Sequence, residues 1–305
     1  MSDLLETLRE RARKLGERVA PVLEGLSEED AAQRALREVC DDVGGGPLTA
    51  WCVPKRDGGA DTGGLASDDK VSVRALCELR DELAWHSGLL EFVLVMQGLG
   101  SYPIALGGSE ELRREVLPDV IQGKRVAAFA LTEPDAGSSL GDISTRATRD
   151  ADGSWRLKGQ KTFISNAGIA ALYTVLARTS GEPGDGSENA LSMFFVPANS
   201  AGIEVRPFEV MAPHPIGEVH FHDVKVSKGH LLGEEGEGLG LALGTLNRFR
   251  TSVAAASNGF SRRALDESKT RLQGRSQFGR PLSSFQALRF DLAEMDCRLR
   301  AAQLL

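Results

Sequence analysis

The chain has 305 residues, 41% of them hydrophobic, which is enough to bury one large core or a few smaller ones. Its formal net charge is −7, and this acidic balance argues against general nucleic-acid binding, which needs clustered cations. The four cysteines form no CxxC or other metal-binding spacing. We therefore expect reduced, mostly buried thiols in a cytoplasmic protein.

The N-terminus carries charges throughout and has no apolar stretch, so no secretory signal is predicted. The most apolar segment, residues 89–106, is interrupted by charged and polar residues, two glycines and a proline. We expect it to form a buried helix over 88–99 followed by a turn, not a membrane span. No membrane partner is predicted.

Residues 1–125 have the pattern of a helical domain. Leu4, Leu5, Leu8, Leu15 and Val19 recur at helical spacing with charged residues between them. Further helices are expected near residues 28–42, 70–86, 88–99 and 109–122. The glycine-rich stretch 57–65 is expected to be a loop.

Residues 126–232 have the pattern of a β domain. Short segments rich in apolar or β-branched residues predict strands at 126–131, 155–158, 161–165, 173–177, 191–196, 203–206 and 218–226. Turn clusters separate them, and the sequence Asp-Ala-Asp-Gly at 150–153 is a hairpin signal. Strands at this spacing predict a compact β-barrel or sandwich.

Residues 233–305 return to a helical pattern. A long alanine-rich helix is expected over 239–270, and a second helix from about 283 to the end. Leu305 lies inside a helical pattern with no cap signal before it, so we expect this last domain to be incomplete. The predicted fold class is α+β, with an N-terminal helical domain, a central β domain and a C-terminal helical bundle.

Polar groups gather where the first predicted strand ends. Residues 129–138, Phe-Ala-Leu-Thr-Glu-Pro-Asp-Ala-Gly-Ser, run from a strand into a turn set by Pro134 and Gly137. The hydroxyls of Thr132 and Ser138 and the free backbone N–H groups suit flavin carbonyls and pyrophosphate oxygens. An ordinary turn with local Ser and Thr caps would carry the same residues.

A second segment, residues 159–168, offers an aromatic wall. Phe163 and Ser165 lie two residues apart on a predicted strand, so they are expected to share a face. An aromatic ring beside a hydroxyl could supply a stacking surface and a hydrogen bond to a ring nitrogen. The alternative is a core phenylalanine with a satisfied serine.

Together the two segments resemble the central signature of the acyl-CoA dehydrogenase family. That signature is an aromatic residue, two residues, Thr-Glu-Pro, two residues and Gly-Ser, then a hairpin and Gly-Gln-Lys, an aromatic residue, Ile, Ser or Thr, and Asn. Two further matches are Arg-Ser-Gln-Phe-Gly-Arg-Pro-Leu at 275–282, followed by Gln286, and Leu-Gly-Glu-Glu-Gly-Glu-Gly-Leu at 232–239. The four matches keep the order of the family and cover the chain from about residue 90.

The resemblance implies an FAD cofactor and assigns residues to its ring. Phe129, Leu131 and Thr132 fall where the family lines the flavin with strand backbone and a threonine hydroxyl. Phe163 takes the position of the aromatic wall, and Ser165 lies beside the reactive N5.

Other residues are implied at the edges of the site. Ser138 falls where a serine contacts the flavin pyrophosphate and the thioester tail. Arg275, Gln277 and Phe278 fall where the family reaches the FAD of a neighbouring subunit, which implies a homodimer or homotetramer. Arg250 matches an arginine near the mouth of the active site, although a surface arginine paired with a carboxylate is an equal alternative.

The activity implied by the resemblance is α,β-dehydrogenation of an acyl thioester, carried on CoA or on an acyl carrier protein, in fatty acid metabolism. Electrons would pass to an electron-transfer flavoprotein. The catalytic base of the family is a glutamate, at one of two positions. The first is Phe249 here, which cannot act as a base, so we expect the base beyond Leu305. Glu267 and Glu294 are interpreted as solvated helix-surface residues.

Two alternatives stay open. One is an oxygen-using flavoenzyme of the same fold, either an acyl-CoA oxidase or a flavin monooxygenase. The other is a truncated, non-catalytic protein that binds acyl thioesters. No metal site is predicted, because His220 and His222 alternate on one strand but have no third ligand nearby in the sequence.

Overall fold

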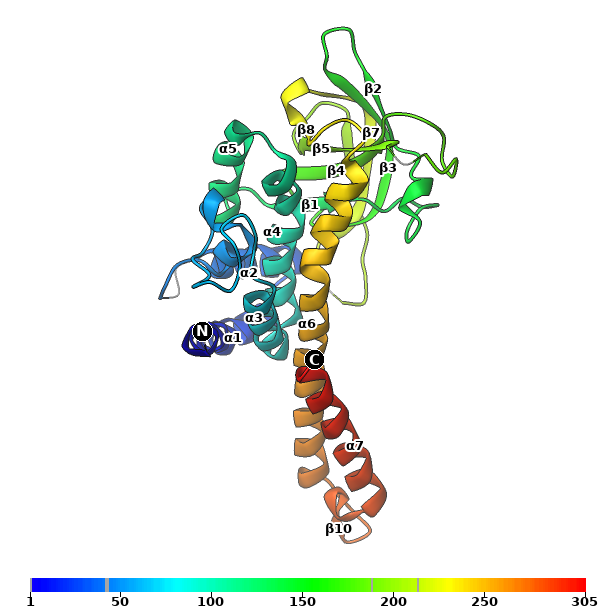
Figure 1. The fold of residues 1–305 in the computed structure, drawn as a ribbon. Coiled ribbons are helices and arrows are strands. Elements are labelled where there is room, and N and C mark those ends of the chain that lie inside the picture. The colour runs from blue at the N-terminus through cyan, green and yellow to red at the C-terminus, as the bar shows by residue number, and fades with distance from the viewer. Residues whose placement is uncertain (1, 42–43, 188, 213) are drawn as a thin grey trace.

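The computed structural model describes residues 2–41, 44–187, 189–212 and 214–305. Helices come first in the chain, followed by a β domain and then by two more helices (Figure 1). This order confirms the predicted fold class. The N-terminal helices are α1 (Ser2–Leu23), α2 (Glu28–Cys40), α3 (Val73–His86), α4 (Gly88–Gly107) and α5 (Glu110–Ile121).

Serine caps decide where four of these helices begin. Ser27, Ser72, Ser87 and Ser109 each accept a hydrogen bond from a backbone N–H in the first turn of the helix that follows. The third helix therefore begins at Val73, not near residue 70. The last residue of the helix predicted over 28–42 lies outside the described residues.

Helix α4 continues to Gly107, so the prediction that it ends in a turn near residue 99 is wrong. Its glycines are sites of close packing. A Cβ atom at Gly98 would lie 2.5 Å from Cε1 of Phe249, and one at Gly100 would lie 2.6 Å from the backbone nitrogen of Ala128. Pro103 lies inside the helix and is buried, although a proline there removes a backbone hydrogen bond.

Among the described residues, α4 is also the one helix that is long and apolar enough to cross a membrane. Of the residues in its most apolar window, 78% are buried inside the protein. Burial of this extent is what a core helix shows, and by length and composition alone such a helix is weak evidence for a membrane span.

The β domain is a mixed sheet in the order β6-β7-β3-β2-β4-β5-β8, with β1 paired in parallel to β4. The strands are β1 (Ala127–Ala130), β2 (Arg146–Arg149), β3 (Trp155–Ser165), β4 (Leu172–Arg178), β5 (Leu191–Pro197), β6 (Ile203–Pro207), β7 (Ile216–Val226) and β8 (Leu231–Leu232). Strand β2 was not predicted, because half of its residues are arginines.

Two segments predicted as separate strands form the single strand β3. Gly159 joins them with a φ of 150°, and a Cβ atom there would lie 2.5 Å from Oγ1 of Thr145. The sequence pattern suggested a break at this glycine. In the structure, the absence of a side chain at Gly159 lets Thr145 approach the middle of the strand closely.

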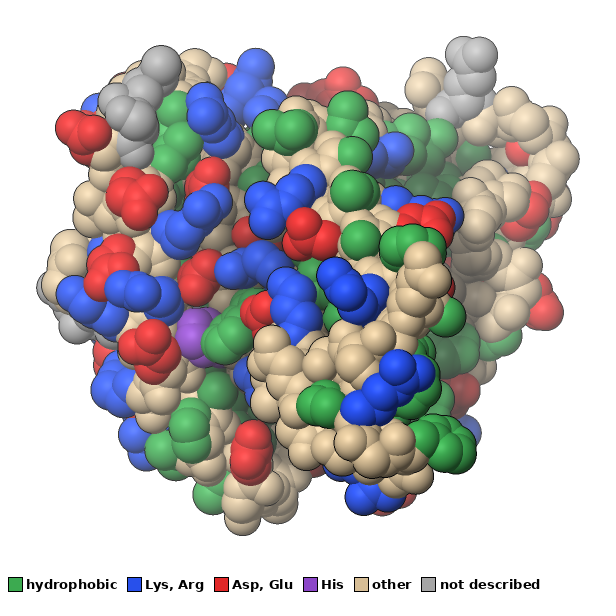
Figure 2. Space-filling model, turned by 90° about the horizontal axis from the view of Figure 1, so that it is seen from below, with side chains coloured by type: hydrophobic (Ala, Val, Ile, Leu, Met, Phe, Trp, Pro, Cys, Tyr) green, Lys and Arg blue, Asp and Glu red, His purple; other side chains and the backbone are tan. Residues whose placement is uncertain are grey.

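The C-terminal helices are α6 (Gly238–Gly274) and α7 (Gln286–Gln303). With 37 residues, α6 is about 55 Å long. Its N-terminal and middle parts pack beside α4 and α3, and its C-terminal part extends away from the body with α7 antiparallel to it (Figure 1). No described residue of α7 is buried. Seen from below, basic, acidic and hydrophobic side chains are interspersed on the surface (Figure 2).

Candidate functional site

The first motif forms a tight turn directly after β1. Glu133 N–H donates to the carbonyl of Ala136 at 2.9 Å, and Ala136 N–H donates back to Glu133 at 3.2 Å. Pro134 lies between them, at the position where its fixed φ suits a turn. Thr132 is half-buried just before the turn. Ser138 is exposed just after it, and its hydroxyl bonds to no described residue.

A buried ion pair anchors this turn to β3. Lys161 of β3 is fully buried, and its Nζ lies 2.8 Å from Oε1 of Glu133 and 2.8 Å from the carbonyl oxygen of Leu131. Glu133 also accepts hydrogen bonds from the backbone N–H groups of Ser144 and Thr145, at 2.8 and 2.9 Å. The Ser144 hydroxyl donates a further one at 2.7 Å.

Both members of this pair are charged at neutral pH. Burial by itself raises the pKa of Glu133, but the charge of Lys161 and the hydrogen bonds from its neighbours lower that pKa to about 2. Burial lowers the pKa of Lys161 to about 8, against the opposing effect of Glu133. Both residues lie within the sequence motifs, but no role was predicted for either. The sequence feature that could have indicated a role is that each is a charged residue in a segment otherwise rich in apolar or hydroxyl-bearing residues.

Phe163 projects from β3 into solvent. Its φ is 54°, and its side chain is 63% exposed. The register between β3 and β7 shifts between Lys161 and Ile164, so the strict alternation behind the predicted shared face with Ser165 is interrupted here. Ser165 is half-buried. Phe163 contacts the ring of Phe208 edge-on, with the centroids 5.4 Å apart.

Asn166 ties the end of β3 to the start of β1. Its Nδ2 donates to the carbonyl of Ala127 at 3.0 Å, and its backbone N–H donates to Pro215 at 2.7 Å. The backbone is left-handed, with a φ of 65°, which asparagine tolerates better than most residues. Its Oδ1 is buried and accepts no hydrogen bond within the described chain.

The structure therefore brings the two central motifs together. Phe129 is half-buried on β1, Leu131 and Thr132 follow it, and β3 places Phe163 and Ser165 beside them. Lys161 and Asn166 fasten β3 to the two ends of β1.

Comparison with known proteins agrees with this arrangement along the whole chain. Residues 2–124 match the N-terminal domain model of acyl-CoA dehydrogenases, residues 128–224 the middle domain, and residues 236–305 the C-terminal domain. A curated relative, cyclohexane-1-carbonyl-CoA dehydrogenase of Geobacter metallireducens, is 31% identical over 98% of this chain and 74% of its own length. The chain belongs to the acyl-CoA dehydrogenase family.

Solved structures of the family share the fold. Butyryl-CoA dehydrogenase from Megasphaera elsdenii superposes with a TM-score of 0.85 at 29% identity, covering 99% of this chain and 77% of its own. An acyl-CoA dehydrogenase from Bacillus anthracis, solved in complex with FAD, gives a TM-score of 0.85 at 27% identity, with coverages of 99% and 50%. This chain thus spans about three quarters of the length of the butyryl-CoA enzyme.

Not every residue implied by the family resemblance joins the central site. Arg275, Gln277 and Phe278 lie at the tip of the α6–α7 hairpin, in and beside the short strands β9 (Ser276–Gln277) and β10 (Arg280–Pro281). The tip lies at the opposite end of α6 from the β domain (Figure 1). Phe278 is 91% exposed, with a φ of 54°. Within one chain, these residues cannot reach Phe163.

Two neighbouring residues of α6 have contrasting environments. Phe249 is buried edge-on against Tyr102, with ring centroids 5.6 Å apart. Arg250 is exposed and forms no ion pair with any described carboxylate. Its guanidinium is therefore open to a ligand or to another chain.

A cavity of about 370 Å³ adjoins the aromatic wall. Phe208 and Ile216 line it; Phe208 contacts Phe163, and Ile216 pairs with Ser165 across the sheet. Neither of these two residues was predicted from sequence, because no motif covers Phe208, which directly follows β6, or Ile216, which begins β7.

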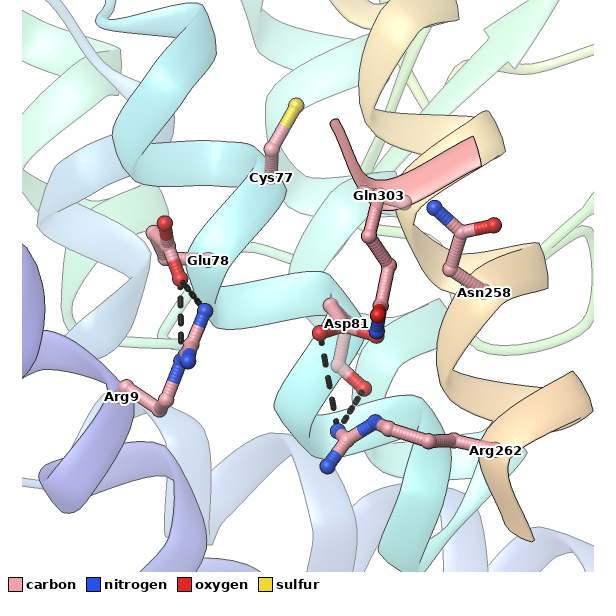
Figure 3. A pocket seen from close by; sticks show the side chains of 8 residues that line it. Arg9, Cys77, Glu78, Asp81, Asn258, Arg262 and Gln303 are labelled. Carbon is pink, nitrogen blue, oxygen red and sulfur yellow. Dashed lines mark hydrogen bonds and ion pairs between the residues drawn. The ribbon is translucent and has the colours of Figure 1, made fainter. Parts of the chain in front are cut away.

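A polar cavity of about 360 Å³ lies elsewhere, between α1, α3, α6 and the end of α7 (Figure 3). Its charged groups face one another. Arg9 pairs with Glu78 at 2.5 Å, and Arg262 approaches Asp81 at 3.6 Å. No residue of the family motifs lines this cavity, so we assign it no part in the site.

The two histidines weighed as metal ligands lie on β7 with their rings stacked 6.1 Å apart. His220 contacts Glu218 at 3.0 Å, and His222 contacts Glu204 at 3.1 Å. Within the described ranges, no group of three or more His, Cys, Asp and Glu side chains could hold a metal ion.

Proposed function

We propose that this protein is an FAD-dependent acyl-CoA dehydrogenase that forms an α,β-unsaturated acyl thioester. The observation that carries the proposal is the exposed Phe163, held at a left-handed φ beside the hydroxyls that follow β1. A large aromatic side chain in solvent, on a strained backbone, is costly unless a ligand covers it.

The residues present fit a flavin. The buried Oδ1 of Asn166 lacks a donor among the described residues, and the exposed hydroxyl of Ser138 also lacks a partner there. The ring system of a flavin carries an N–H donor, carbonyl acceptors and a flat apolar face. These features match the unpaired acceptor Oδ1 of Asn166, the free hydroxyls and the exposed ring of Phe163.

We assign Thr132 and Ser165 to bind the ring edge, Phe163 to cover one face, and Ser138 to contact the pyrophosphate and the thioester tail. Phe129 and Leu131 contribute strand backbone to the same wall. Bound FAD would supply an acceptor for the β-hydride of the substrate. The residues of this chain bind, orient and shield that ring, and none of those at the wall can remove an α-proton.

We place the general base outside these 305 residues. Phe249 stands at one family position for the glutamate, and it is apolar and buried. Arg250, exposed beside it, is assigned to the mouth of the site, where it would meet an anionic part of the substrate.

For the remaining partners we propose acyl-CoA as the substrate, with a carrier-protein thioester as the alternative, and an electron-transfer flavoprotein as the electron acceptor. The hairpin tip with Arg275, Gln277 and Phe278 would complete the FAD site of a second copy in a homodimer or homotetramer. The described cysteines are unpaired, which supports the cytoplasmic location that we propose. We also propose a role in fatty acid metabolism. We propose domain boundaries at 1–125, 126–232 and 233–305.

The test is to purify the complete gene product and record its visible spectrum before and after addition of FAD. A bound flavin spectrum is expected. Protein that carries no flavin and takes none up would refute the proposal. Oxygen consumption with an acyl-CoA substrate would identify the oxidase or monooxygenase alternative, and flavin binding without turnover would identify a non-catalytic protein.

A further inference from the structure

The segment that follows β1 is held by β3, although β1 itself pairs with β4. Three successive groups of the 131–133 segment are each held from residues 161–162. Lys161 Nζ donates to the Leu131 carbonyl, Thr162 N–H donates to the Thr132 carbonyl at 2.9 Å, and Lys161 Nζ donates again to Glu133.

Burying an ion pair is a poor way to gain stability. Lys161 is 0% exposed and Glu133 is 4% exposed, so both charges have lost nearly all their water. Desolvation commonly cancels the attraction within such a pair, and apolar residues of similar volume often serve stability as well. The pair has a different effect here, because it fixes the position and direction of the backbone that carries Thr132.

From this geometry we infer that Lys161 and Glu133 are positioning residues for the flavin, acting through Thr132 and Phe163. The inference rests on the proposed function. Lys161 is two residues before Phe163, so one short stretch of β3 both clamps the Thr132 backbone and presents the aromatic wall. A change in the clamp would alter the distance between the hydroxyl and the ring face that a bound flavin must fit.

Two variants test the inference. Lys161→Met keeps the length of the side chain and removes the ammonium group. Glu133→Gln is milder, because it keeps the shape but gives the Ser144 and Thr145 donors an amide in place of a carboxylate. If Lys161→Met does not fold, Glu133→Gln carries the test.

Glu38→Gln is the matched control. Glu38 is also 4% exposed and ion-paired, to Arg18 and Arg34 at 2.7 and 2.6 Å, but it pairs toward α1 and does not line the cavity beside the aromatic wall. This variant reports what the loss of a buried carboxylate does to stability alone. The melting temperature, the FAD dissociation constant and the visible circular dichroism of the bound flavin are measured for every variant.

We expect Lys161→Met and Glu133→Gln to weaken FAD binding by about tenfold or more and to change the flavin dichroism. Glu38→Gln is expected to lower the melting temperature with FAD affinity within about twofold of the wild type. FAD affinity and dichroism unchanged in both site variants would overturn the inference while leaving the proposed function standing. A wild-type protein that binds no FAD would overturn both.

Discussion

Glu133 makes the stability of the β domain sensitive to acid. Its folded-state pKa of about 2 is below the ordinary value of 4.5, so the ionised form is the one that the fold favours. The resulting stability is present above pH 4.5 and is lost as the pH falls toward 2. It amounts to at most about 3 kcal/mol.

Glu133→Gln removes that dependence. Chemical unfolding of the wild type and the variant at several values between pH 6 and pH 3 is the measurement. The wild type is expected to be the more stable at pH 6, and the difference is expected to shrink toward pH 3. A difference that stays constant over this range would show that Glu133 does not titrate with folding.

Phe163 is predicted to matter for the ligand and little for the fold. Its side chain is 63% exposed, so Phe163→Ala is expected to change the free energy of unfolding by less than about 1 kcal/mol. FAD affinity is expected to fall by about tenfold, since stacking on one face is lost. Phe290→Ala on α7, at 64% exposure, is the control and should leave FAD affinity unchanged. Equal effects of both variants would count against a flavin wall.

At this scale the sequence predicted residue types better than conformations. The motif spacing predicted roles for Thr132, Ser138, Phe163 and Ser165; in the structure the first two follow β1 and the last two lie on β3. The buried pair could not be predicted, because its partners are 28 positions apart and charged residues are normally expected at the surface. The sequence around Phe163 does not predict its positive φ, because an aromatic residue rarely adopts one.

Among the elements, α4 joins the helical core to the β domain. Gly100→Ala would place a Cβ atom 2.6 Å from the Ala128 backbone nitrogen, and backbone cannot move aside as a side chain can. We expect a loss of about 1–3 kcal/mol in the free energy of unfolding. Calorimetry or chemical denaturation measures it.

Gly240→Ala is the control for that substitution. Gly240 lies in the first turn of α6, and a Cβ atom there would meet nothing within 4 Å. Alanine is expected to stabilise the protein by about 0.5–1 kcal/mol through reduced flexibility of the unfolded chain. Equal destabilisation by both alanines would show that the loss at Gly100 does not come from close packing there.

Helix α4 shows where a local sequence pattern fails to predict the end of an element. Two glycines and Pro103 predict a turn after residue 99, yet α4 continues to Gly107. The glycines are explained by Phe249 and by β1, which are distant in sequence. Gly159 in β3 is a second example, because the close approach of Thr145 requires a glycine at that position. The long alanine-rich helix α6 was predicted within a few residues of its ends.

On the scale of the whole molecule, the distance between the hairpin tip and the β domain predicts a shared site. Arg275 is exposed, so Arg275→Ala is expected to leave the melting temperature unchanged and to weaken FAD binding by about tenfold. Arg271→Ala, four residues earlier on α6, is the charge-matched control. Titration with FAD and sedimentation analysis are the measurements.

Mixing subunits makes this prediction sharper. A chain carrying Arg275→Ala has an intact wall, and one carrying Phe163→Ala has an intact tip. A mixed oligomer is therefore expected to contain one complete site and to bind more FAD than either variant alone. No gain on mixing would show that the tip serves no neighbouring site.

The most direct test of the account is an anaerobic titration of the FAD-loaded complete protein with acyl-CoA thioesters, followed at the visible flavin bands. We expect the bands to bleach as the α,β-unsaturated thioester forms, and an electron-transfer flavoprotein to restore them. A bound flavin whose spectrum stays unchanged with acyl-CoA thioesters of short, long, branched and aromatic chains would contradict it.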